Sequence, residues 1–151
     1  MMKKTAVGLV FFMAMLAMTS GAVLAAAQKV VLVPCPINYP GPNFPPGGGF
    51  VIFNNPKGAD HNLEVTVSLK GVTPSTEYDI YLFIDQGVTG EKIGTLKTNP
   101  KGNANFHING LLEEGTHVLA IDITLKGSGA DVYETSGIHD VPMEGPSMTF
   151  K

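Results

Sequence analysis

Short runs in which apolar and polar residues alternate fill the chain from residue 50 onward. Residues 63–69, LEVTVSL, carry leucine and valine on one parity and polar side chains on the other. Because successive side chains of a strand point to opposite faces, this period of two predicts a strand with one buried and one solvated face. Residues 104–108 and 119–125 repeat the pattern, and residues 78–84 are apolar on both parities, which predicts a strand covered on both sides.

Turn-forming residues separate these runs, and no long window shows apolar residues at helical spacing. Short runs of β-branched and aromatic residues at this rhythm predict roughly seven to nine strands. A parallel sheet would need crossover connections, for which the chain has no room. The chain is therefore predicted to be all-β, as an antiparallel sandwich or barrel.

The N-terminal segment has the pattern of a secretory signal peptide. Lys3 and Lys4 precede an uncharged apolar run, and small residues follow at Ala25 and Ala27. The run is too short to be preferred as a membrane-spanning helix. We therefore expect residues 1–27 to direct export and to be removed, which makes the protein secreted, periplasmic or attached to the cell envelope.

Two parts are expected after the signal peptide. Residues 28–49 combine a short N-terminal strand with a connection rich in proline and glycine. Because proline lacks the amide donor, this connection cannot form a central strand. Residues 50–151 are expected to form the β-sandwich domain. No second apolar run is long enough to cross a bilayer, so no membrane span is expected in the mature chain.

Charge excludes one class of partner. All ten basic residues are lysines, and eight of them lie beyond residue 27 together with all thirteen acidic residues, which gives the exported part a net charge of −5. Cationic side chains neutralise phosphates, and arginine supplies the commonest contact to bases. An acidic chain without arginine is therefore not expected to bind nucleic acid.

One stretch of the chain carries a resemblance to a known family. LKGVTPSTEYDIYLFID resembles the L-x-P-x-T-x-Y-x-V corner of fibronectin type III and related immunoglobulin-like domains. The matching positions are Val72, Pro74, Thr76, Tyr78 and Ile80. The resemblance implies an immunoglobulin-like Greek-key sandwich in which the tyrosine ring fills the core and its hydroxyl bonds to the backbone just upstream. Tyr78 and Pro74 are therefore expected to be structural residues.

The corner lies earlier in this chain than in the fibronectin type III family. There it falls on the penultimate strand, whereas here some four further strand-like runs follow it. A different Greek key and a shared corner without shared descent would each account for this position. The later segment GTLKTNPKGNANFHINGLLEEGTHVLAIDI looks like a hairpin of small secreted bacterial and archaeal β-sandwich domains, and it implies no activity.

The one cysteine, Cys35, lies in the proline-rich connection. A lipid anchor would need a cysteine directly after the signal cleavage point, and a thiol nucleophile would need a recognisable neighbouring base; neither is found. The expected state is an inert, core-facing thiol, and an interchain disulfide is the alternative.

The four histidines of the chain are His61, His107, His117 and His139. None is paired with another at a spacing that lets both rings face one ion. His117 shares the parity of the inward residues of its strand, so we expect a hydrogen-bonded structural side chain. His139, Met143 and Met148 are ligands suited to Cu(I), so a small periplasmic copper-binding protein, with Cys35 as a further ligand, is an alternative function. Outside that alternative no metal and no cofactor is expected.

Five carboxylates lie on or beside the predicted strands: Asp79, Asp85, Asp122, Asp131 and Glu134. Paired acids serve glycoside hydrolysis, and oxygen ligands hold calcium, so a secreted hydrolase is a third hypothesis. The chain has no calcium-loop motif, no G-x-S-x-G and no phosphate-binding loop. We expect these acids to be solvated on outward faces, as the parity of Asp122 indicates, and we expect no catalytic residue.

The leading hypothesis is an exported, non-enzymatic β-sandwich with a structural or interaction role at the cell surface or in the periplasm. Its partner would be a protein, a ligand or a surface polymer that meets an exposed sheet face or edge. The candidate contact residues are Tyr81, Phe83, Asn103, Asn105 and Asn109.

Overall fold

The computed structural model describes residues 27–35, 45–56, 62–85, 89–135, 138, 143 and 145–150. The nine strands of this part are β1 (Gln28–Pro34), β2 (Gly48–Asn54), β3 (Asn62–Lys70), β4 (Glu77–Ile84), β5 (Glu91–Lys97), β6 (Ala104–Leu111), β7 (Gly115–Leu125), β8 (Ala130–Thr135) and β9 (Ser147–Phe150). The predicted all-β class is thus confirmed, whereas residues 1–26 of the predicted signal peptide lie outside the described residues. Within the described ranges, no helix has the length and hydropathy to cross a membrane.

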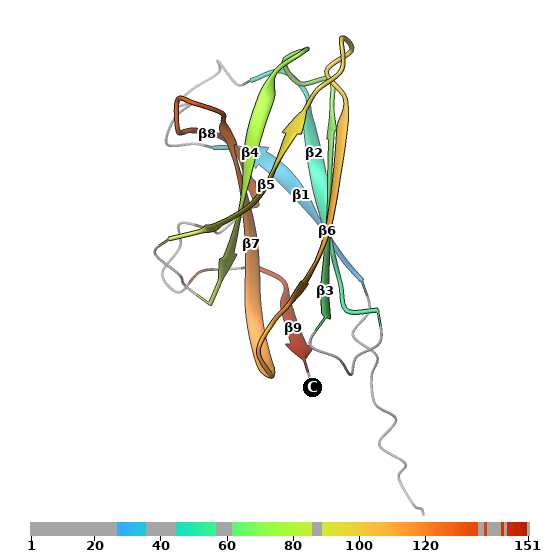
Figure 1. Cartoon of the computed structure of the whole chain (residues 1–151), viewed down its shortest axis with the longest axis vertical. Coiled ribbons are helices and arrows are strands. Elements are labelled where there is room, and N and C mark those ends of the chain that lie inside the picture. The colour runs from blue at the N-terminus through green and yellow to red at the C-terminus, as the bar shows by residue number, and fades with distance from the viewer. Residues whose placement is uncertain are drawn as a thin grey trace, which may run out of the picture.

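The strands form one antiparallel sheet that curls back on itself. Their order is β5-β4-β7-β8-β1-β2-β3-β6, and β9 pairs with β7. Strands β5 and β6 are consecutive in sequence but lie at opposite ends of this order, so the turn between them brings the ends of the sheet together. The result is a nearly closed barrel (Figure 1).

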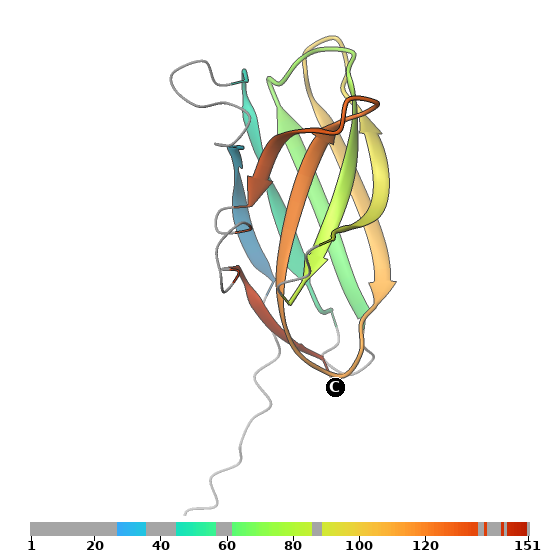
Figure 2. The ribbon, with the colours of Figure 1, turned by 90° about the vertical axis from the view of Figure 1, so that its left-hand side faces the viewer.

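Strand β7 carries much of the pairing. Its second half pairs with β4 on one edge and with β8 on the other, and its first half pairs with β9. Figure 2 shows β9 beside the lower part of β7, close to β1. Gln28 Nε2 donates to Ser147 O at 2.8 Å, and Asn55 Nδ2 donates to Thr149 O at 3.3 Å. Strand β9 therefore fills the space between the start of β7 and the β1–β2 hairpin.

One parity of the strands fills the interior. Val65 and Val67 of β3, Ile80 of β4, and Ile121 and Ile123 of β7 are each at most 1% exposed. The other parity of β3 is polar and only half-buried near its start. The alternation predicted for β3 and for the inward residues of β7 is thus confirmed, and it places the core inside the curled sheet.

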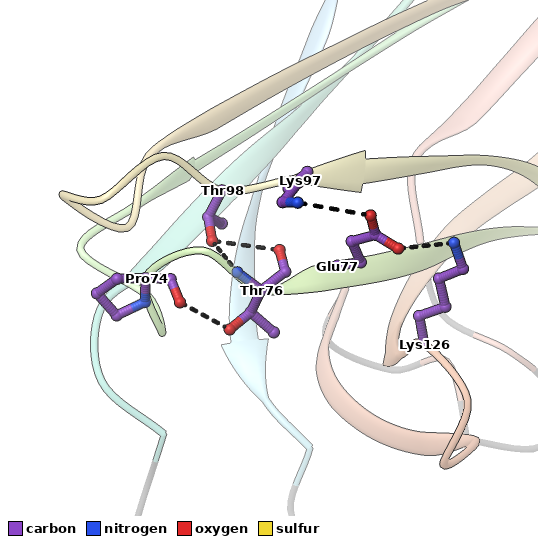
Figure 3. A network of polar contacts seen from close by, with 6 residues as sticks. All are labelled: Pro74, Thr76, Glu77, Lys97, Thr98 and Lys126. Atoms are coloured by element: carbon purple, nitrogen blue, oxygen red, sulfur yellow. Dashed lines mark hydrogen bonds and ion pairs between the residues drawn. The ribbon is translucent and has the colours of Figure 1, made fainter.

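The corner before β4 is tied by a threonine at the end of β5. The Tyr78 ring is buried in the core, as predicted. Thr98 Oγ1 donates to Thr73 O at 2.7 Å. It also accepts from Thr76 N at 2.9 Å, and Thr76 Oγ1 donates to Pro74 O at 2.9 Å (Figure 3). Among the described residues the Tyr78 hydroxyl has no hydrogen-bond partner. The expectation that this hydroxyl ties the corner is therefore wrong, because Thr98 satisfies the backbone there.

An ion-pair network lies beside this corner. Glu77, the first residue of β4, contacts Lys126 Nζ at 2.7 Å and Lys97 Nζ at 3.9 Å (Figure 3). The hydrogen bond and charge of Lys126 hold the pKa of Glu77 below its usual range. All three side chains are more than two-fifths exposed, so water screens the pairs and they add little stability.

We predict that Thr98→Val destabilises the fold by about 1–3 kcal/mol. The valine keeps the shape but leaves the Thr76 amide and the Thr73 carbonyl without their buried partner. Urea unfolding measures the loss, with Thr116→Val, at an exposed position on β7, as the matched control. Equal stability of the two variants would show that Thr98 does not hold the corner.

Candidate functional site

A tight turn joins β5 to β6. Gly102 N donates to Asn99 O at 2.9 Å, and Asn99 Oδ1 accepts from Lys101 N at 2.8 Å and from Asn103 N at 3.0 Å. Gly102 has a φ of +74°, and a Cβ on it would lie 2.0 Å from Val72 O. A residue with a side chain fits neither the dihedral angle nor the space. The turn therefore fixes how the two strands leave it.

Beyond the turn, β5 and β6 diverge. The Phe106 ring of β6 covers Gly94 of β5, where a Cβ would lie 2.3 Å from the ring. No ladder joins β5 to β6 in the described part of the chain, and Figure 1 shows the two strands separating below their turn. Each strand thus keeps one edge unpaired, and the sheet stays open along this seam.

A cavity of about 310 Å³ lies at the seam, between the β3–β6 pair and the β4–β5 pair. Seven aliphatic side chains line it: Leu63, Val65, Leu82, Ile84, Ile93, Ile108 and Leu112. Gly110 of β6 pairs with Leu63 and also lines the cavity. A Cβ added at Gly110 would meet no atom within 4 Å, so this glycine leaves room that a side chain would fill.

Two charged residues of β5 lie at the rim of the cavity, and their surroundings differ. Lys92 Nζ lies 2.9 Å from Asp79 Oδ1, which also accepts from Thr95 Oγ1 at 2.7 Å. The bonds from Thr95 and then Lys92 hold the pKa of Asp79 below its usual range. Glu91 is paired with Leu82, so its side chain is on the cavity's face of the sheet, and it is exposed. It has no ion-pair partner among the described residues.

The outward carboxylates of β7 and β8 are buried, which contradicts the expectation that they are solvated. Asp122 is 5% exposed and Glu134, its cross-strand neighbour, 4%. The outer face of β7 is covered nearby, where Ala120 packs with Ile138 and Met143; we call these three residues the outer cluster. The alternation within β7 predicted that the Asp122 side chain faces solvent. It could not show that residues after β8 cover this face of the strand.

The environment of Asp122 favours its neutral form. Burial raises the pKa of Asp122 to about 8, and a hydrogen bond with Asp131 and the charges of Asp131 and Glu134 act in the same direction. Oδ1 of Asp122 has no hydrogen-bond partner in the described part of the chain. The hydrolase hypothesis required two carboxyls facing an open groove. Asp122 and Glu134 are instead buried within a strand pair, and neither lines the cavity.

We predict that Asp122→Asn stabilises the protein at neutral pH by about 1–4 kcal/mol. Between about pH 4 and pH 8 the unfolded chain releases the Asp122 proton while the folded chain keeps it, so the free energy of unfolding falls as pH rises. The amide keeps the shape and the donor but does not titrate. Urea unfolding across this range is expected to show a flatter curve for Asp122→Asn than for the wild type. The exposed-site control Glu114→Gln should follow the wild type, and an unchanged slope in Asp122→Asn would refute the assignment.

His117 joins the start of β7 to the end of β4. Its Nδ1 lies 2.5 Å from Asp85 Oδ2 and its Nε2 lies 3.0 Å from Glu113 O, and Asp85 Oδ1 accepts from Val118 N at 2.8 Å. Both ring nitrogens face acceptors, which only the doubly protonated ring can satisfy. The bond to Asp85 raises the pKa of His117. Burial acts to raise the pKa of Asp85, but the bonds from His117 and Val118 outweigh it and lower that pKa. The predicted hydrogen-bonded histidine is confirmed.

We predict a second pH dependence from this pair. Because the folded pKa of His117 is above its unfolded value of about 6.5, its contribution is complete below that pH and is lost as pH rises through the folded pKa. In an Asp122→Asn background, His117→Gln should lower stability at mildly acidic pH by up to ~1 kcal/mol and have less effect at alkaline pH. His107→Gln, at an exposed histidine whose Nδ1 contacts the neutral Thr66 hydroxyl, is the control. A His117→Gln effect that does not vary with pH would contradict the ion pair.

The two methionines of the copper hypothesis that the structure describes lie in different clusters. Met143 belongs to the outer cluster, whereas Met148 is buried in the main core, and His139 lies outside the described residues. Among the described residues, no group of three or more histidine, cysteine, aspartate or glutamate side chains is placed to hold a metal ion. Cys35 is fully buried, which agrees with the predicted core-facing thiol. An interchain disulfide would require this part of the chain to open.

The candidate contact residues are divided between packing, a turn and solvent. Phe83 is partly buried against the outer cluster, and Tyr81 is half-buried on the same face of β4. Asn103 Oδ1 accepts from the amide of Gly71 at 3.1 Å. Asn105 and Asn109 are exposed on the outer face of β6. None of these side chains lines the cavity, and their role in binding a partner stays a prediction.

No protein-family model, no curated protein and no solved structure matches the chain. Fold and cavity together define an all-β protein with a nearly closed antiparallel barrel and an aliphatic cavity at its open seam. The sequence contained one sign of this cavity. The parity of Phe106 and Ile108 continues to Gly110, which lines the cavity and has no side chain to enter it.

Proposed function

We propose that the protein is an exported, non-enzymatic binding module that holds a small aliphatic molecule in the cavity between β5 and β6. The observation that carries the proposal is a cavity of about 310 Å³ with seven aliphatic side chains around it. Pockets for small molecules begin at roughly this size and are lined mainly by apolar groups.

The lining favours an apolar occupant over water. The cavity is partly open to solvent, so an apolar molecule that enters it displaces water from the aliphatic side chains. In another protein, an enclosed cavity of roughly half this volume with a similar lining takes up apolar molecules. Transfer of a hydrocarbon chain from water into such a space is favourable by ~0.8 kcal/mol for each buried methylene.

Binding, and not catalysis, is what the lining supports. Among the described lining residues only Glu91 and Lys92 are charged, and the Lys92 ammonium is bonded to Asp79. The acids with the most unusual surroundings, Asp122 and Glu134, do not reach the cavity. The described part of the lining contains no nucleophile with an adjacent base.

Two parts of the proposal rest on sequence alone. Export rests on residues 1–27, and an immunoglobulin-like relationship rests on the corner from Val72 to Ile80. The antiparallel all-β sheet is compatible with that relationship. Proteins of one fold class have many different functions, so the proposed function is inferred from the cavity and not from the fold.

We predict that the protein binds 1-octanol and that Gly110→Ile weakens this binding at least about tenfold. The new side chain enters the space that Gly110 leaves open, so it competes with the ligand. Isothermal titration calorimetry measures the affinity, and amide chemical shifts of Ile93 and Ile108 locate the ligand.

Gly48→Ile is the matched control. Gly48 also lies in a strand and a Cβ there meets nothing within 4 Å, but it is not part of the cavity lining. Both variants replace a strand glycine, which costs little or stabilises. Equal binding by both variants, or no binding by the wild type, would reject the cavity as a site for aliphatic ligands.

A further inference from the structure

The charges around the seam lead to a statement about the ligand's head group, which rests on the proposed function. A chain that fills the aliphatic cavity must leave its polar end at the rim, where water and the residues of β5 are. The chemistry of that rim therefore selects among molecules with the same hydrocarbon part.

Two cations described at this end of the barrel are already bonded to carboxylates. Lys92 Nζ lies 2.9 Å from Asp79 Oδ1, and His117 Nδ1 lies 2.5 Å from Asp85 Oδ2. An incoming anion would have to compete with these carboxylates. Glu91 remains, on the cavity's face, with no ion-pair partner among the described residues.

Further negative charge lies close to the lining. Glu113 and Glu114 directly follow Leu112, a lining residue, at the β6–β7 turn. The unpaired edges of β5 and β6 border the opening, and an edge strand presents carbonyl oxygens that accept hydrogen bonds. An ammonium group offers three donors and a positive charge to such surroundings.

We infer that the cavity selects aliphatic amines, with the chain between β5 and β6 and the ammonium group at Glu91. A fatty acid of equal length is disfavoured, because its carboxylate would face Glu91, and the two cations described at this end of the barrel, Lys92 and His117, are already bonded to carboxylates. Glu91 is exposed, so water and salt screen the attraction and the preference is modest.

The test compares octylamine, 1-octanol and octanoate by calorimetry at neutral pH, where the amine is protonated. We expect octylamine to bind about three- to tenfold more tightly than 1-octanol, and octanoate to bind more weakly than either. Glu91→Gln should remove most of this preference, measured as the ratio of the octylamine affinity to the 1-octanol affinity within the same variant, and high salt should reduce the ratio in the wild type.

Glu64→Gln is the matched control. Glu64 lies on β3, next to the lining residues Leu63 and Val65 in sequence, but its Oε2 accepts from Asn54 Nδ2 at 2.9 Å, away from the cavity. This variant removes the same charge and should keep the preference for octylamine.

The outcomes separate the two proposals. Equal affinity for the three ligands, tighter binding of octanoate, or a preference that survives Glu91→Gln would overturn the amine selectivity while the cavity remains a binding site. Failure of all three ligands to bind the wild type would overturn the proposed function itself, and the selectivity with it.

Discussion

The turn at residues 98–103 determines the form of the whole sheet, because it joins strands that lie at opposite ends of the strand order. Asn99 caps the turn, and Gly102 supplies the one backbone conformation that brings it against Val72. The strands then separate: the Phe106 ring packs on the face of Gly94, and β5 and β6 form no ladder in the described part of the chain. A barrel closed by hydrogen bonds along its full length would have no seam. The cavity therefore follows from how two strands leave one turn.

The carboxylates fall into two groups whose contributions to the free energy of unfolding change with pH in opposite directions. Asp79, Glu77 and Asp85 are bonded to cations and have lowered pKa values, so their ionised forms suit the fold. Asp122 is buried beside Asp131, and its protonated form is the one that the folded state favours. The free energy of unfolding therefore falls on both sides of an optimum. At low pH the bonded carboxylates become protonated, and as pH rises both Asp122 and His117 lose their favoured protonation states. The barrel is expected to be most stable at mildly acidic pH.

Much of the fold could be predicted from the sequence, because alternation reports directly which face of a strand is buried. Val65, Val67, Ile121 and Ile123 are core residues for this reason. Prediction failed where burial depends on a distant segment: Asp122 has outward parity, and local pattern does not show that residues beyond β8 cover the outer face. The resemblance placed Tyr78 correctly in the core but assigned the corner's hydrogen bond to its hydroxyl, and that bond is made by Thr98, which is twenty residues further along the chain.

The cavity could not be predicted for a related reason. Its lining comes from four strands and one loop, and each side chain in it looks like an ordinary core residue in its own strand. Two features distinguish the site from the rest of the core. Gly110 adds no side chain, and the described strands β5 and β6 form no ladder there. The lack of pairing between β5 and β6 also provides a route by which a ligand can enter the cavity. A molecule that enters between these strands breaks no backbone hydrogen bond between them, so entry requires side chains to move but leaves the sheet intact. Its hydrocarbon part then leads inward and its polar end stays beside Glu91, which ties the ligand's orientation to the geometry of the seam.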